Sequence, residues 1–195
     1  MSDLCSRLMA RGISPDIGMN LHALLLAGTV PVLIGTSSFD VISAYADSVS
    51  GGKPHWIPVG GSLFEPSDLL ARFDPVSRTL IPHSGGIIDL LLDESNSMHI
   101  VVLDGFNRAP VDGYLIPLLK SVHDIASGSS SPRSIPLAPQ RLMSPNDAYA
   151  DVSRIAWRRS VLLVLSPSTG PSTLPVPAEL WEWCSAFGTD KPFPK

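Results

Sequence analysis

Cysteine is scarce in this sequence, which has only Cys5 and Cys184 among its 195 residues. The two cysteines lie far apart, neither belongs to a C-x-x-C pair, and no histidine pair stands near them. A disulfide scaffold needs several cysteines, and a structural zinc site needs cysteine and histidine at short, fixed spacings. Both kinds of staple are therefore excluded as the basis of the fold, and a reducing, cytoplasmic compartment is expected.

Charge and long apolar runs are also in short supply. Charged residues make up 16% of the chain, the formal net charge is −4, and basic residues cluster only at Arg154, Arg158 and Arg159. Such a chain gives no long-range attraction for nucleic acid or an anionic membrane, so neither is expected as a partner. No apolar run reaches the ~18 residues of a membrane span, and no secretory signal opens the sequence.

What the chain does have is a high hydrophobic content of 44%, arranged in short apolar runs that alternate with helical periodicity. The runs predict strands at residues 30–34, 56–59, 99–103 and 160–165, whereas helical spacing predicts helices at 3–11, 15–27, 36–49, 67–73, 87–92, 111–125 and 178–187. Alternating strands and helices predict an α/β fold with a mostly parallel sheet covered on both faces. We expect one domain over residues 1–195, with a flexible, Ser- and Pro-rich linker at about 127–145.

A motif at the end of the third strand carries a family resemblance. Residues 101–110 read VVLDGFNRAP and are followed at 114–119 by YLIPLL. This stretch resembles the Walker B strand and following helix of AAA+ ATPases, and is closest to the MoxR-like and modification-dependent restriction branch. The resemblance extends over about residues 17–187 and implies a three-layer, P-loop NTPase-like α/β/α sandwich. The family's helical lid is expected to be absent, because only eight residues follow Phe187.

The resemblance implies a damaged hydrolytic site. In the family, the Walker B Asp holds Mg²⁺ and the next residue, a Glu, orients the attacking water. Here Asp104 is retained as a possible Mg²⁺ ligand, but Gly105 stands at the Glu position and offers no side chain to activate water. The competing interpretation is that Asp104 and Gly105 only form a strand-ending turn.

The phosphate-binding loop is degenerate as well. Gly35, Thr36, Ser37 and Ser38 follow the first strand, where the family has its glycine-rich loop and lysine, and no lysine stands at this junction. The two serines could meet a phosphate or, more commonly, cap the next helix. Without the lysine and the glycine loop, the phosphates lose both a point charge and a nest of backbone amides.

Three further segments follow the order of the family. Residues 64–75 and 83–91 resemble the segment that leads into a hairpin insert, which lines the pore of a ring in relatives. Ser166 stands at the tip of the sensor 1 strand, and Glu182 and Trp183 stand where the arginine finger is expected. Four catalytic features thus fail together.

The vestigial nucleotide site therefore comprises a small set of residues: Gly35, Thr36, Ser37, Ser38, Asp104, Asn107, Arg108 and Ser166. No catalytic residue and no cofactor is expected, and ATP or GTP with Mg²⁺ is the alternative. Three functions stay open: a non-hydrolysing AAA+-like assembly subunit, a residual NTPase subunit of a remodelling complex, and an α/β interaction scaffold. The expected partner is another protein, such as an active AAA+ relative, or a second copy of the chain.

Overall fold

Five parallel strands form the central sheet of the computed structural model, which describes residues 2–95 and 97–190. They are β1 (Val30–Ile34), β2 (His55–Pro58), β5 (His99–Asp104), β8 (Val161–Ser166) and β9 (Cys184–Gly188). Their order across the sheet is β2-β5-β8-β1-β9, and every neighbouring pair is parallel. The predicted mostly parallel sheet is confirmed, with β9 as a fifth strand that the sequence had not indicated.

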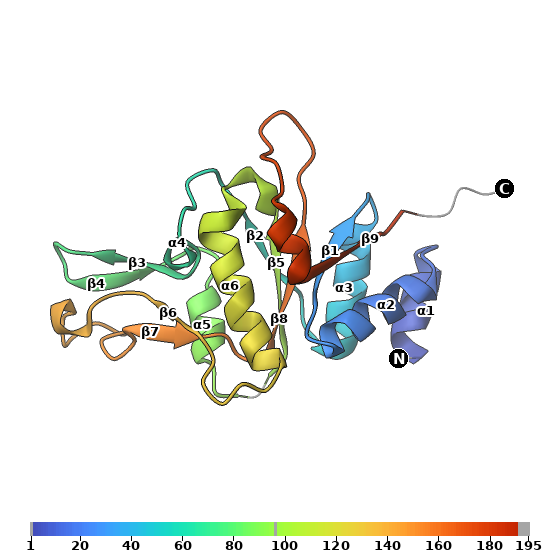
Figure 1. Ribbon diagram of the computed structural model, residues 1–195. Helices are drawn as coiled ribbons and strands as arrows, with labels where there is room; N and C mark the ends of the chain where they lie inside the picture. The colour runs from blue at the N-terminus through green and yellow to red at the C-terminus, as the bar shows by residue number, and fades with distance from the viewer. Residues whose placement is uncertain (1, 96, 191–195) are drawn as a thin grey trace.

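Helices cover both faces of the sheet (Figure 1). On one face lie α1 (Ser2–Ala10), α2 (Pro15–Leu26) and α3 (Ser38–Val49); on the other lie α4 (Pro66–Leu70), α5 (Ile87–Leu92), α6 (Val111–Ala126) and the 3-10 turn η3 (Ala178–Glu182). Each face has its own buried apolar cluster, because alternate strand residues point to opposite sides. The three-layer α/β/α sandwich is confirmed. Among the described residues, no helix combines the length and apolarity needed to cross a bilayer.

Helix ends follow the local chemistry of the sequence. The hydroxyl of Ser14 accepts a hydrogen bond from the backbone N–H of Asp16, and Pro15 occupies the first turn of α2. The chain leaves α2 through Gly28, whose φ of 72° lies in the left-handed region. An added Cβ at Gly28 would lie 2.3 Å from the Cβ of Ala126, so the α2–β1 turn packs directly on the end of α6.

Two small hairpins extend from the body, on the left of Figure 1. The first pairs β3 (Ala71–Asp74) with β4 (Thr79–Pro82), and the second pairs β6 (Ser134–Pro136) with β7 (Arg154–Ala156). We call residues 71–82 and 134–156 together the wing. Arg78 joins its two halves, because its Nε donates to the carbonyl of Leu142 at 2.7 Å and its own carbonyl accepts the N–H of Ser144 at 2.7 Å.

The wing corrects two predictions of secondary structure. The helix predicted at 67–73 ends at Leu70, and Ala71 adopts extended backbone and begins β3. The Asp74 carboxylate accepts the N–H groups of Val76 and Ser77 and so shapes the hairpin turn. The segment at 127–145 contains β6 and the 3-10 turn η2 (Gln140–Leu142), with Ile135 buried. Its mobility stays a prediction.

The helix predicted at 178–187 is wrong. Residues 178–182 form η3, and the chain then extends as β9 along the free edge of β1, over five residue pairs. Leu180, Trp183 and Phe187 have helical spacing, but pairing with an uncovered strand edge satisfies more backbone groups than a short helix would. Cys184 accordingly packs in one core cluster and Phe187 against the other, as expected of a strand.

Candidate functional site

The predicted site residues gather at one edge of the sheet, because the strands are parallel and their carboxyl ends point the same way. Gly35 follows β1, Asp104 ends β5 and Ser166 ends β8. Asp104 and Ser166 are direct partners in the β5–β8 ladder. The chain leaves β1 toward β2 and leaves β8 toward β9, in opposite directions across the sheet. The crevice between such strands is where open α/β sheets bind ligands.

The loop after β1 is very short, and its backbone N–H donor at Thr36 is already hydrogen-bonded within the chain. Only residues 35–37 separate β1 from α3. The carboxylate Oδ1 of Asp190 accepts the backbone N–H of Thr36 at 2.7 Å and the Thr36 hydroxyl at 3.2 Å. A carboxylate of the chain itself therefore takes the backbone donor that a phosphate-binding loop would offer to its ligand.

The two predicted serines of this loop are buried and serve the local structure. The Ser38 hydroxyl donates to the carbonyl of Gly35 at 2.8 Å and lies 3.0 Å from the hydroxyl of Thr189, which is fully buried. Ser37 stands at the N-cap position of α3 without a side-chain capping bond. The β1–α3 loop is thus tied to the segment that follows β9.

Gly35 is required by this closed arrangement. Its φ of 134° lies in a region that residues with a Cβ rarely adopt. A Cβ placed there would lie 2.5 Å from Oδ1 of Asp190 and 2.8 Å from Oγ1 of Thr189. Any larger residue would push the Asp190 carboxylate out of its position.

At the end of β5, Asp104 is exposed, and its carboxylate makes no hydrogen bond or ion pair within the part of the chain that the structure describes. Gly105 has a φ of 71°, and its N–H donates to the Ser166 carbonyl at 2.8 Å. A Cβ on Gly105 would lie 3.0 Å from Nε of Arg108. A glutamate at this position would therefore need a strained backbone and a displaced arginine.

Asn107 and Arg108 both turn toward the loop after β8. The Asn107 side chain donates to the Ser168 carbonyl at 3.1 Å and accepts the Ser168 N–H at 2.8 Å. Two guanidinium nitrogens of Arg108 donate to the Ser168 hydroxyl, at 3.0 and 2.8 Å. The Leu174 N–H donates to the Asn107 carbonyl at 2.7 Å. The two residues therefore hold the loop over residues 167–174.

A buried tyrosine supports this turn from below. The Tyr114 hydroxyl donates to the carbonyl of Phe106, in the 3-10 turn η1 (Phe106–Arg108), at 2.7 Å. Burial raises the pKa of the Tyr114 phenol, so the group stays protonated and keeps its donor at physiological pH. The position of Asn107 and Arg108 is therefore fixed by the core.

The structure forms two groups from the predicted residues and does not join them. Thr36 and Ser38 bond to Asp190 and Thr189, whereas Asn107 and Arg108 bond to Ser168. Ser168, Thr189 and Asp190 were not identified from the sequence. Ser168 carried only the signal of a loop, and Asp190 lies beyond the region predicted to be a helix. The described residues include no cluster of three or more potential metal ligands.

Trp183, which stands where the resemblance places an arginine finger, packs inward. The Trp183 ring meets His123 edge to face, with centroids 5.2 Å apart, and the Lys120 ammonium lies 5.9 Å from its centroid. Its Nε1 is buried and has no hydrogen-bond partner among the described residues. Trp183 is therefore a packing residue of the α6 face.

These features define the class of fold: a three-layer α/β/α sandwich of the P-loop NTPase-like type, with Gly35, Asp104 and Ser166 at the carboxyl edge of its parallel sheet. Neither a protein-family model nor a curated protein matches the sequence. A similar solved structure is that of a "putative ATPase" from Cytophaga hutchinsonii, with a TM-score of 0.50 and 15% identity. The match covers 89% of this chain and 44% of the other, so the chain spans less than half of that protein.

Proposed function

We propose that this chain is a catalytically degenerate AAA+-like protein that serves as a non-hydrolysing binding or assembly subunit. The observation that carries the proposal is the Asp190 carboxylate, which is hydrogen-bonded to Thr36 where a nucleotide phosphate would have to lie. A phosphate would need to displace this carboxylate and would meet a like charge while doing so. Nucleotide binding at this loop is therefore disfavoured.

The rest of the edge supports the same conclusion. No lysine follows the β1 loop, so the β- and γ-phosphates lack the point charge that P-loop proteins supply. Gly105 cannot orient water, and its left-handed backbone disfavours any residue that could. Arg108 is bound to Ser168. Apart from the free carboxylate of Asp104, the residues at this edge disfavour a magnesium–triphosphate complex.

Exposed apolar side chains near this edge favour a protein partner. Ile34 is 47% exposed at the end of β1, Phe39 is 60% exposed in the first turn of α3, and Phe64 is 60% exposed in the loop after β2. Large exposed apolar side chains in one region are typical of interaction surfaces. We infer that a second copy of the chain, or an active AAA+ relative, docks at this edge.

The proposal is tested by titrating ATP and GTP into the purified protein with and without Mg²⁺, and by measuring phosphate release. We expect no saturable binding heat and no release above a buffer blank. Sedimentation of the protein alone and with a candidate active relative measures the assembly. Turnover that disappears in Asp104→Ala would overturn the proposal.

A second candidate function rests on Asp104 itself. Its exposed carboxylate, free of partners among the described residues, leaves a possible Mg²⁺ ligand at the correct strand end for residual nucleotide binding. In that case ATP binding would require Mg²⁺ and would be lost in Asp104→Asn. An α/β interaction scaffold, the third candidate, would bind a partner that is unrelated to AAA+ proteins.

A further inference from the structure

A hollow lies at the opposite, amino edge of the sheet, away from the candidate nucleotide site. It has a volume of about 440 Å³ and opens between the ends of α2 and α6, below β1 and β8. Its walls are mainly apolar and include Leu25 of α2, Val122 of α6, Trp157 and Leu162. The contact between Gly28 and Ala126 fixes the two helix layers where they frame this hollow.

Two adjacent arginines line the same hollow, and they belong to the only basic cluster in the sequence. Arg158 is half-buried and donates through Nη1 to the carbonyl of Asp93. Arg159 is exposed and donates through Nη2 to the carbonyl of Ile125 at 3.1 Å. In residues 2–95 and 97–190, neither guanidinium has a carboxylate within ion-pair distance.

The pair is not fully explained by local structure. Arg159 bonds to a carbonyl in the last turn of α6, which is a common use of arginine at a helix end. Arg158 likewise bonds to the carbonyl of Asp93, the C-cap residue of the six-residue helix α5, but its half-buried cation has no carboxylate within ion-pair distance among the described residues. Each guanidinium also has five N–H donors, of which the observed bonds use one.

We propose that this hollow, the arginine pocket, binds a small amphipathic anion whose apolar chain or ring fills the space and whose carboxylate or phosphate lies against Arg158 and Arg159. The volume falls in the range of small-molecule sites, which are mostly apolar with few, well-placed polar groups. Arginine is suited to carboxylate and phosphate alike, because its planar fork donates two parallel hydrogen bonds. The proposal does not depend on the proposed function, since the two sites lie at opposite edges of the sheet.

The test is isothermal titration of the purified chain with three probes that share a ten-carbon tail: decanoate and decyl phosphate, each below its micelle concentration, and decan-1-ol below its solubility limit. We expect the better anion to bind at least about tenfold more tightly than the neutral alcohol, as hydrogen bonds to a charged group imply. The tighter of the two anions identifies the carboxylate or the phosphorylated source.

Variants separate the charge from the cavity. The double change Arg158→Gln with Arg159→Gln should reduce anion affinity to that of decan-1-ol and leave the alcohol unchanged, whereas Arg141→Gln, on the wing, should change neither. Met98→Trp should fill the hollow and abolish binding of all three probes; Met19→Trp, at an exposed position of α2 outside the hollow, is its matched control. Circular dichroism and thermal melts verify the fold of each variant.

Equal affinities of the anions and the alcohol for the wild-type chain would overturn the proposal. Unchanged anion binding in the arginine double variant would do the same, because the pair would then serve only to cap carbonyls. Absence of saturable binding of all three probes would also refute it and would leave the hollow as a feature of packing.

Discussion

The Asp190 carboxylate accepts the backbone N–H of Thr36 at 2.7 Å and so joins two residues that lie 154 positions apart. The bond lies just before the N-cap residue Ser37 of α3, so Asp190 ties the β1–α3 loop to the segment that follows β9. The same contact gives the loop after β1 a structural role, which substitutions at Asp190 and Gly35 test.

Removal of this contact should weaken the fold without creating an enzyme. Asp190→Ala should lower the free energy of unfolding by about 1–2 kcal/mol, as for a lost hydrogen bond to a charged group. Urea denaturation measures the change, and Asp151→Ala, at an exposed position outside the helices and strands, is the control. An unchanged stability would mean that the Thr36 contact contributes nothing in solution.

Gly35→Ala should destabilise the protein more than Asp190→Ala does, because it combines an unfavourable backbone conformation with a steric clash at Asp190. We expect the free energy of unfolding to fall by about 1–3 kcal/mol, which is typical of a residue forced into a sparsely populated conformation. Gly52→Ala is the matched control, because a Cβ there meets only the Ser50 hydroxyl at 3.9 Å and φ is not positive. Equal stabilities of the two variants would contradict the closed geometry of the loop.

Gly105→Glu should not produce hydrolysis of ATP or GTP, although it restores the side chain that the resemblance implies. The variant still lacks a phosphate lysine, and its glutamate must adopt a φ near 71° and move Arg108. Phosphate release should stay at the buffer blank, and the protein should be destabilised by about 1–2 kcal/mol. Robust turnover by this single variant would refute the interpretation of the β1 loop.

The His55–His99 pair should make stability depend on pH. The rings meet edge to face, with centroids 5.7 Å apart, and burial followed by the nearby His99 lowers the pKa of His55 below 6.5. The folded protein therefore binds fewer protons than the unfolded chain below that pH, so its stability falls as pH drops through the lowered pKa. Urea denaturation at about pH 7.5 and at about pH 5 measures the effect. Between these pH values, the free energy of unfolding should fall less in His55→Gln than in the wild-type protein. The same loss in both proteins would assign the dependence to other groups.

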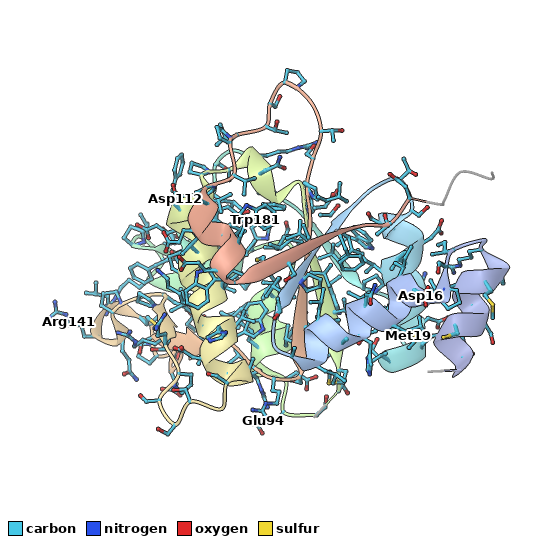
Figure 2. The ribbon with its side chains drawn as sticks, turned by 45° about the vertical axis from the view of Figure 1, so that its right-hand side comes forward. Asp16, Met19, Glu94, Asp112, Arg141 and Trp181 are labelled. Carbon is cyan, nitrogen blue, oxygen red and sulfur yellow. The ribbon has the colours of Figure 1, made fainter. Side chains whose placement is uncertain are left out.

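Limited trypsin digestion tests the mobility of residues 127–145. Arg141 lies exposed at the outer end of the wing (Figure 2), and Arg133 is exposed just before β6. The first cut should fall after one of them and before any cut after Arg108, because Arg108 follows the central strand β5 and is held by Ser168. Early cleavage at Arg108, with Arg133 and Arg141 protected, would mean that residues 127–145 are ordered.

The sequence predicted those elements whose signals are local. Val30–Ile34 is a compact apolar run between glycines, and the structure places β1 at the same residues. Helix α5 also lies at the predicted residues. Its signals, the helical spacing of apolar residues and the glycines just before it, are all local in the sequence. The order of strands and helices therefore sufficed for the α/β sandwich.

The features that were missed depend on contacts between distant residues. β9 exists because the edge of β1 needs a partner, and nothing near Cys184 indicates that partner. β6 and β7 are three residues each and are defined by their pairing with one another. Likewise, Asp104, Asn107 and Ser166 could be placed at one edge from the strand ends alone, but the occupation of the Thr36 donor by Asp190 could not.

The pairing of β9 with β1 also sets an order for synthesis and folding. When β1 has left the ribosome, one of its edges must wait until residues 184–188 have been made, about 150 positions later. Contacts of such wide separation slow folding, and a nascent strand edge exposes unpaired backbone groups. During synthesis, the first strand of the sheet therefore keeps an unpaired edge until the last strand is made.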